Sequence, residues 1–195
     1  TTQIAQNLFA GAVALESVVI PDTVTVIEDS AFRGCLRLTD VTIGQAVTEI
    51  KGYAFDRCVS LSELAISQAV KKIGDYAFSS CISLQSVVMP DRVTKIGNYA
   101  FDSCSNLQSV TLSKSLVELG RRAFAYTAIE SIEIPKSLDI CSKYSDYSYE
   151  FDGVYYYVYD GPFFCCENLK SVTFAEGTTQ IAQNLFAGAV ALESV

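Results

Sequence analysis

Residues 93–112 read V-T-K-I-G-N-Y-A-F-D-S-C-S-N-L-Q-S-V-T-L, and residues 70–90 repeat them as V-K-K-I-G-D-Y-A-F-S-S-C-I-S-L-Q-S-V-V-M-P. The phenylalanine in this motif recurs with a 23-residue period, at Phe9, Phe32, Phe55, Phe78, Phe101 and Phe124. The pattern is then interrupted, and it resumes with the same period at Phe163 and Phe186. A fixed period of this length is typical of a solenoid, whose stacked repeats bury one continuous core. The sequence therefore predicts about eight coils, one of them interrupted.

The second half of each repeat predicts a strand. Residues 107–112 read L-Q-S-V-T-L, which is the strand segment of a leucine-rich repeat. Val110 and Leu112 alternate with Ser109 and Thr111, so one set faces the core and the other faces solvent. Stacked copies should form a single parallel sheet with a polar outer face.

The first half of each repeat predicts a short helix. Ile96, Ala100, Cys104 and Leu107 are spaced by four, four and three residues, which gives a helix one apolar stripe toward the core. The position before this helix holds Asp29, Asp75 or Asn98 in three repeats, and these residue types cap helix N-termini. The predicted fold is α/β: a right-handed leucine-rich-repeat solenoid with one parallel sheet and one β-hairpin insertion, spanning residues 1–195.

The repeat resembles that of a known family. The pattern I-G-x-x-A-F-x-x-C-x-x-L-x-x-V-x-I-P, carried by residues 73–90 and 96–112, is similar to the BspA-type leucine-rich repeat. The match covers nearly the whole chain outside residues 142–161. The resemblance implies a large tandem-repeat protein, secreted or on the surface of bacteria or protozoa, that adheres to host proteins or neighbouring cells. It also implies that the protein has no catalytic residues, although a fold does not fix a function.

Five of the seven cysteines follow the same period. Each lies three residues after a motif phenylalanine, and Ala12, Thr127 and Ala189 fill that position in other repeats. Because small residues replace cysteine, we expect a column of buried, reduced thiols. Stacked coils would bring the Cα atoms to about 5 Å, so the spacing does not exclude disulfides. A zinc site is the weaker alternative, since the chain has no C-x-x-C pair and no histidine.

Residues 142–161 interrupt the pattern with a tyrosine-rich segment. Asp152-Gly153 separates Y-S-Y-E-F from V-Y-Y-Y-V, which predicts a β-hairpin. Tyrosine offers large contact area at low entropic cost, so this segment is the predicted binding surface, unless the hairpin instead packs one face on the solenoid. Seven of the eleven tyrosines lie here: Tyr144, Tyr147, Tyr149, Tyr155, Tyr156, Tyr157 and Tyr159.

Two cysteines bracket the insertion. Cys165 lies outside the column that Cys166 occupies, so Cys141 and Cys165 are the best candidates for a disulfide, although Cys141 also fits a core position. Calcium is a lesser alternative for this segment, because its carboxylates lack the ligand spacing of a calcium loop. We expect no metal and no cofactor.

Composition narrows the functional classes. The net charge of −8 argues against nucleic acid and against anionic membrane surfaces, and no apolar run approaches the length of a membrane span. The chain has no histidine, no G-x-S-x-G and no phosphate-binding loop, so we expect no enzyme. Paired carboxylates such as Asp40 and Glu63 are more simply a solvated face.

The two ends of the chain carry the same sequence. Residues 178–195 are identical to residues 1–18, which defines a 177-residue offset. Both ends fall inside ordinary repeats rather than polar caps, so we expect a fragment of a longer array of 177-residue units.

Two functions follow from these patterns. The first is an extracellular or cell-surface interaction module that adheres to protein or glycan partners. The alternative is a structural stalk or filament, in which near-identical 177-residue units contact one another.

Overall fold

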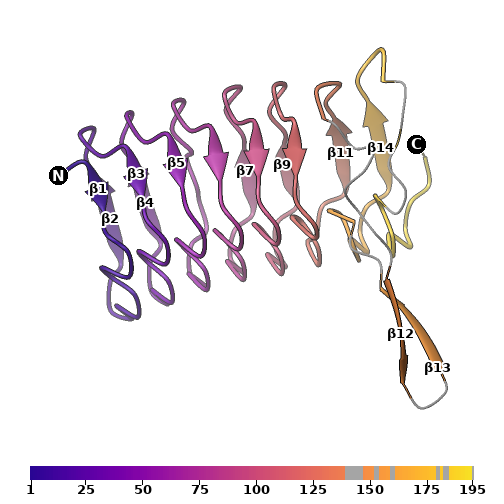
Figure 1. The fold of residues 1–195 in the computed structure, drawn as a ribbon, viewed down its shortest axis with the longest axis horizontal. Helices are drawn as coiled ribbons and strands as arrows, with labels where there is room; N and C mark the ends of the chain where they lie inside the picture. Colours follow the sequence, from indigo (N-terminus) through magenta and orange to yellow (C-terminus); the bar gives the residue numbers. More distant parts are fainter. Residues whose placement is uncertain (139–146, 152–153, 159–160, 179–180, 182–184, 195) are drawn as a thin grey trace.

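A computed structural model of the protein describes residues 1–138, 147–151, 154–158, 161–178, 181 and 185–194. Its coils stand side by side along one axis, from the N-terminal end to the C-terminal end (Figure 1). The extended core contains the repeated apolar residues, which are almost all fully buried between Ile20 and Leu138. The predicted solenoid is therefore present.

Two-residue strands form one parallel sheet along the solenoid. Each strand pairs with its equivalent in the next coil, as in Ile50 opposite Ile73 and Ile73 opposite Ile96. The sheet has six strands: β1 (Gln3–Ile4), β3 (Val26–Ile27), β5 (Glu49–Ile50), β6 (Lys72–Ile73), β8 (Lys95–Ile96) and β10 (Glu118–Leu119). From β1 to β10 the chain makes five turns in constant register, so the expected eight coils, one of them interrupted, are not confirmed.

The longer strands of the L-x-x-L-x-L segments form a second face. They pair in parallel as β2 (Ser17–Ile20) with β4 (Asp40–Ile43), β7 (Ser86–Val88) with β9 (Ser109–Thr111), and β11 (Ser131–Ile134) with β14 (Ser171–Phe174). The predicted parallel pairing of these strands is confirmed. The prediction that they form a single sheet is wrong, because they form three separate pairs.

Departures in the sequence coincide with both breaks in this face. Between β4 and β7 only a bridge from Thr42 to Ala65 remains, and Ala65 stands at a position where most other repeats have valine or threonine, which favour strands more than alanine does. Between β9 and β11 the repeat is one residue shorter, so Ser131 follows Ser109 one position earlier than the period requires. This shortened repeat coincides with the break between β9 and β11.

The described residues contain no helix, so the α/β prediction is wrong. The segment around each motif phenylalanine is a series of turns in which several residues are left-handed, with φ of 58° at Tyr99 and 60° at Ser103. The N–H groups of Tyr99, Phe101 and Ser103 consequently point to the next coil and donate to the carbonyls of residues 121, 123 and 125. A helix would have used these donors internally. The four-four-three spacing reflects core-facing turn positions instead.

The predicted helix caps have a different role. Asp29 accepts a hydrogen bond from the N–H of Gly52, Asp75 accepts one from Asn98, and Asn98 accepts one from Arg121. Each bond joins one coil to the next across a full repeat period. These side chains therefore connect neighbouring coils rather than cap a helix.

Two columns of side chains fill the core. The motif phenylalanines stack ring on ring, with centroids 5.1 to 5.7 Å apart from Phe9 to Phe186. Beside them, the thiol of Cys81 donates to the carbonyl of Phe55 at 3.3 Å, and the thiol of Cys104 donates to that of Phe78 at 3.2 Å. The same contact recurs at Cys35, Cys58 and Cys166. All five thiols are free and buried, as the sequence predicted.

An antiparallel hairpin is present within the insertion. It consists of β12 (Tyr147–Phe151) and β13 (Val154–Val158), with Phe151 opposite Val154. This register leaves two residues between the strands, and these two, Asp152 and Gly153, lie outside the described residues. The hairpin projects from the body of the solenoid near its C-terminal end (Figure 1).

Candidate interaction surfaces

The hairpin is the first candidate surface. Its register places Tyr149 directly opposite Tyr156 and Ser148 opposite Tyr157. Within the described chain β12 and β13 lie against each other and against no other strand. Figure 1 likewise shows the hairpin extending away from the coils. A two-stranded ribbon of this kind can meet a partner with either side.

The structure describes only part of the predicted site. Tyr147 and Tyr149 belong to β12, and Tyr155, Tyr156 and Tyr157 belong to β13. Tyr144, Tyr159 and Cys141 lie outside the described residues. The pairing of Cys141 with Cys165 therefore stays an expectation.

Cys165 lies in a half-buried turn of the coil that follows the hairpin. Its φ is 52°, and a Cβ at position 188 of the next coil would lie 3.0 Å from its Sγ. Burial, followed by the charge of Glu167, raises the pKa of this thiol. The thiol form is therefore favoured over the reactive thiolate at neutral pH.

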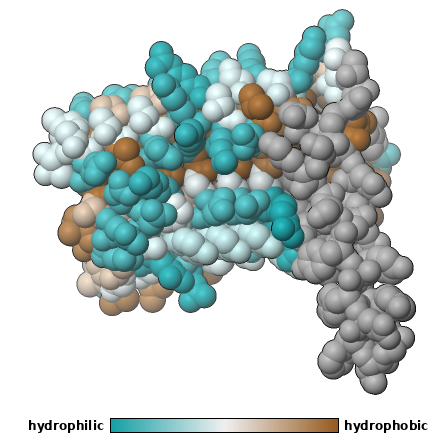
Figure 2. All heavy atoms as spheres, viewed as in Figure 1, coloured by the Kyte–Doolittle hydropathy of each residue, from teal (hydrophilic) through white to brown (hydrophobic). Residues whose placement is uncertain are grey.

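The outer face of the longer strands is the second candidate surface. Val19 and Val88 are 74% and 64% exposed, among serine, threonine and carboxylate side chains. A shallow hollow of about 510 Å³ lies at the first break in this face, lined by Glu63, Ala65 and Gln85 among others. In the view of Figure 2, hydrophilic residues cover much of the coloured surface and apolar residues are scattered among them. This face offers no large apolar anchor, and the energetic centres of interfaces are usually such anchors.

A tyrosine ladder was missed by the sequence interpretation. Tyr53, Tyr76 and Tyr99 stack with ring centroids 4.8 and 4.7 Å apart. Burial, with the neighbouring tyrosines, raises the pKa of Tyr76. Because each ring stacks its face on the neighbouring ring, mainly the ring edges and hydroxyl groups are left to contact solvent. The signal was available, since these tyrosines share one position two residues before the motif phenylalanine.

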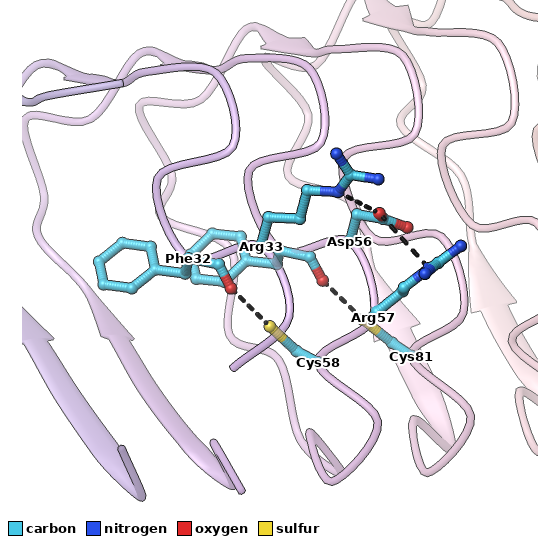
Figure 3. A network of polar contacts seen from close by, with 7 residues as sticks. Phe32, Arg33, Asp56, Arg57, Cys58 and Cys81 are labelled. Carbon is cyan, nitrogen blue, oxygen red and sulfur yellow. Dashed lines mark hydrogen bonds and ion pairs between the residues drawn. The ribbon is translucent and has the colours of Figure 1, made fainter. Parts of the chain in front are cut away.

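A charged network also escaped the sequence interpretation. Arg33 Nε donates to Asp56 Oδ2 at 2.9 Å, and Arg57 Nε lies 4.0 Å from the same oxygen (Figure 3). Asp56 is only 4% exposed, and the Arg33 guanidinium also lies over the Tyr53 ring. A buried carboxylate is costly unless it is paired, and these contacts supply the pairing. Its signal was the opposite charges of Arg33 and Asp56 at equivalent positions of successive repeats.

Two thiols of the cysteine column, Cys104 and Cys166, are chemically inert in this arrangement. Burial raises the pKa of the Cys104 thiol to about 12 and that of Cys166 to about 11. Both thiols are uncharged hydrogen-bond donors at neutral pH. Nucleophilic or metal-binding chemistry needs the thiolate, so the geometry assigns these residues to the core.

In the described part of the chain, no group of histidine, cysteine and carboxylate side chains is arranged to hold a metal ion. No helix there has the length and apolar character needed to cross a membrane.

The fold and its contacts define a class of protein: a leucine-rich-repeat solenoid whose coils are connected by strands and turns. The sequence profile of the BspA type leucine rich repeat region matches residues 2–89 and 71–193, with 6 copies. The chain belongs to this family. The second matched range runs across the tyrosine-rich insertion.

Solved structures of similar proteins extend the comparison. A leucine-rich repeat protein of T. pallidum is 27% identical, with a TM-score of 0.66 over 98% of this chain and 71% of that chain. A leucine rich cell surface protein of Faecalibacterium prausnitzii is 25% identical, with a TM-score of 0.64 over 98% of this chain and 69% of that chain. No curated protein matches the chain.

Proposed function

We propose that the protein is a non-catalytic interaction module, displayed outside the cell or on its surface, that adheres to protein or glycan partners through its hairpin. The observation that carries this proposal is the position of β12 and β13, which lie against no other strand of the described chain. Five of the seven candidate tyrosines belong to these two strands. Tyrosine is among the residue types most enriched at interface hot spots.

The remaining surfaces support the same assignment. In the described coils the repeated phenylalanines, cysteines and tyrosines contact one another between coils. Few of these repeated side chains are therefore left to bind a partner. The acidic net charge of −8 disfavours nucleic acid as a partner. Display at the cell surface is supported by the Faecalibacterium prausnitzii relative, which is described as a cell surface protein.

The duplicated ends favour a second candidate function. Identical 18-residue segments at a 177-residue offset are expected if the chain belongs to an array of near-identical units. Such an array could serve as a stalk or filament in which the hairpin contacts a neighbouring unit. The two functions are compatible if the array displays the hairpins.

Deletion of residues 142–161 tests the leading proposal. The coils before and after the insertion stack directly, with Phe124 and Phe163 5.7 Å apart, so the shortened protein should remain folded. Cooperative unfolding in urea checks this point. Binding is then measured on arrays of immobilised glycans and purified secreted proteins, for both the complete and the shortened chain.

The outcomes separate the alternatives. Loss of the array signals with retained folding supports the hairpin as the binding site. A folded protein that keeps every signal would place the site on the repeats instead. An unfolded protein would identify the insertion as a structural clamp, which contradicts the proposal.

A further inference from the structure

The same 18-residue sequence occupies two different environments in this structure. Residues 1–18 lie at one end of the stack, while their copy at residues 178–195 follows the coil formed by residues 161–177. A comparison of the two copies shows what this sequence contacts when a coil precedes it. The described part of the second copy comprises residues 178, 181 and 185–194.

The second copy is covered by the coil before it. The N–H of Phe163 donates to the carbonyl of Leu185 at 3.3 Å, and the N–H of Cys165 donates to that of Ala187 at 2.9 Å. The rings of Phe163 and Phe186 stack at 5.4 Å. Leu185 is consequently only 1% exposed.

The first copy has the same groups and lacks this cover. Leu8, the counterpart of Leu185, is 55% exposed, and Phe9, the counterpart of Phe186, is 37% exposed. No backbone donor within the described chain reaches the carbonyls of Leu8 and Ala10, whose counterparts accept from Phe163 and Cys165. On its other side the first copy is complete, since Phe9 and Gly11 donate to the carbonyls of Ala31 and Arg33.

We propose that residues 1–18 form a socket for a coil with the sequence of residues 161–177 from a second copy of the 177-residue unit. Identical sequences present identical acceptors and the same apolar leucine and phenylalanine, so they should take the same neighbour. Successive units then share one unbroken core rather than standing as beads on a linker. The inference rests on the duplication and not on what the hairpin binds, so each can fail without the other.

This arrangement fixes the spacing of the hairpins. Phe9 and its counterpart Phe186 are separated by seven steps of the phenylalanine stack, through Phe163. At about 5 Å for each step, one unit adds about 35 Å to the solenoid. Each hairpin would therefore recur about every 35 Å along a continuous rod.

The chain itself offers a matched pair of substitutions to test the socket. In the unaltered chain, residues 178–195 cover the coil of residues 161–177 and belong to the same chain. Their effective concentration is therefore high, and residues 1–18 of a second molecule cannot compete with them. Leu185→Glu places a carboxylate at the buried contact and should release this segment. The uncovered coil of residues 161–177 can then take residues 1–18 of another molecule. We expect concentration-dependent head-to-tail association of this variant in sedimentation analysis.

Leu8→Glu is the matched control, because it changes the same residue of the other copy at an exposed position. Alone it should leave the unfolding midpoint and the monomeric state unchanged. Added to Leu185→Glu, it should abolish the association. Equal association of the single and double variants would overturn the proposal, as would a Leu185→Glu variant that stays monomeric over its soluble concentration range.

A second measurement does not depend on releasing the segment. A two-unit chain, in which residues 1–177 precede the complete sequence, should scatter X-rays as one rigid elongated body about 35 Å longer along the stack than the single chain. Scattering from two bodies that vary in relative orientation would overturn the unbroken core.

Discussion

Substitution of Phe78 by alanine should be among the most damaging single changes to the solenoid. The Phe78 ring is fully buried and stacks on Phe55 at 5.2 Å and on Phe101 at 5.1 Å. Buried phenylalanine-to-alanine changes cost about 3–5 kcal/mol of unfolding free energy, and ring stacking adds to this cost beyond area burial. Because both ring faces are stacked, we expect about 4–5 kcal/mol.

Phe9→Ala provides the matched comparison. Phe9 stacks on Phe32 alone within the described chain and is 37% exposed, so its removal should cost about 2 kcal/mol. Urea unfolding followed by circular dichroism measures both variants. In a solenoid each repeat contacts only its neighbours, so Phe78→Ala should also broaden or split the transition. Equal losses for the two variants, or a loss below about 1 kcal/mol for Phe78→Ala, would refute the continuous aromatic core.

Three other predictions concern the turns and the thiols. Ser80 has φ of 58°, a region that glycine adopts more easily than other residues, so Ser80→Gly should raise the unfolding free energy by up to about 1 kcal/mol. Gly34 has φ of 71°, so Gly34→Ala should lower the unfolding free energy by a similar amount. Urea titration measures both changes, and the reverse signs would contradict the left-handed turns. Cys81→Ala should cost about 1–2 kcal/mol in the same assay, because it leaves a small cavity. It also removes one of the two donors to the Phe55 carbonyl, which keeps the N–H of Cys58. A disulfide found at this thiol by mass spectrometry would count against the assignment. Burial raises the pKa of Cys104 from 9.0 to about 12, so this thiol contributes stability that is present below pH 9 and lost as the pH rises through about 12. Between these values the unaltered chain should lose about 1.4 kcal/mol per pH unit more than Cys104→Ala, and parallel pH profiles would show that burial does not protect the thiol.

The period of the repeat was sufficient to predict much of the core. The regular spacing of the phenylalanines predicted the ring stack, and alanine or threonine in the place of cysteine predicted the buried free thiols. Both predictions depend on which residues are equivalent in successive coils, and the spacing gives that information directly. The Asp-Gly pair between two runs of strand formers likewise predicted the position of the β12–β13 hairpin.

The spacing of the apolar residues alone could not exclude the helix predicted in the first half of each repeat. Ile96, Ala100, Cys104 and Leu107 have helical spacing, but Tyr99 and Ser103 adopt positive φ between them. Residues other than glycine seldom do so, and the cost is offset only when the next coil accepts their N–H groups. That acceptor belongs to the stacked neighbour and is invisible in a single repeat. Gly34 and Gly11 at the equivalent of Ser103 were the available clue.

The predicted binding site belongs to the hairpin of β12 and β13. The backbone register of β12 and β13 opposes one pair of tyrosines, Tyr149 and Tyr156. The Tyr53–Tyr76–Tyr99 ladder shows that tyrosine in this protein also serves stacking between coils. Tyrosine content alone therefore did not distinguish a binding surface from a structural one; the isolation of the hairpin from other described strands does favour binding.

In the proposed function the repeats build the scaffold and the hairpin makes the contact. The most direct test of this function compares two double variants on one partner from the arrays, by surface plasmon resonance. Tyr149→Ser with Tyr156→Ser removes an opposed aromatic pair from the hairpin, and Val19→Glu with Val88→Glu alters the exposed strand face. We predict that the tyrosine variant loses at least about tenfold in affinity, as expected for hot-spot aromatics, while the valine variant binds as the unaltered chain does. Unchanged binding by the tyrosine variant together with loss by the valine variant would contradict the claim and assign the contact to the repeats.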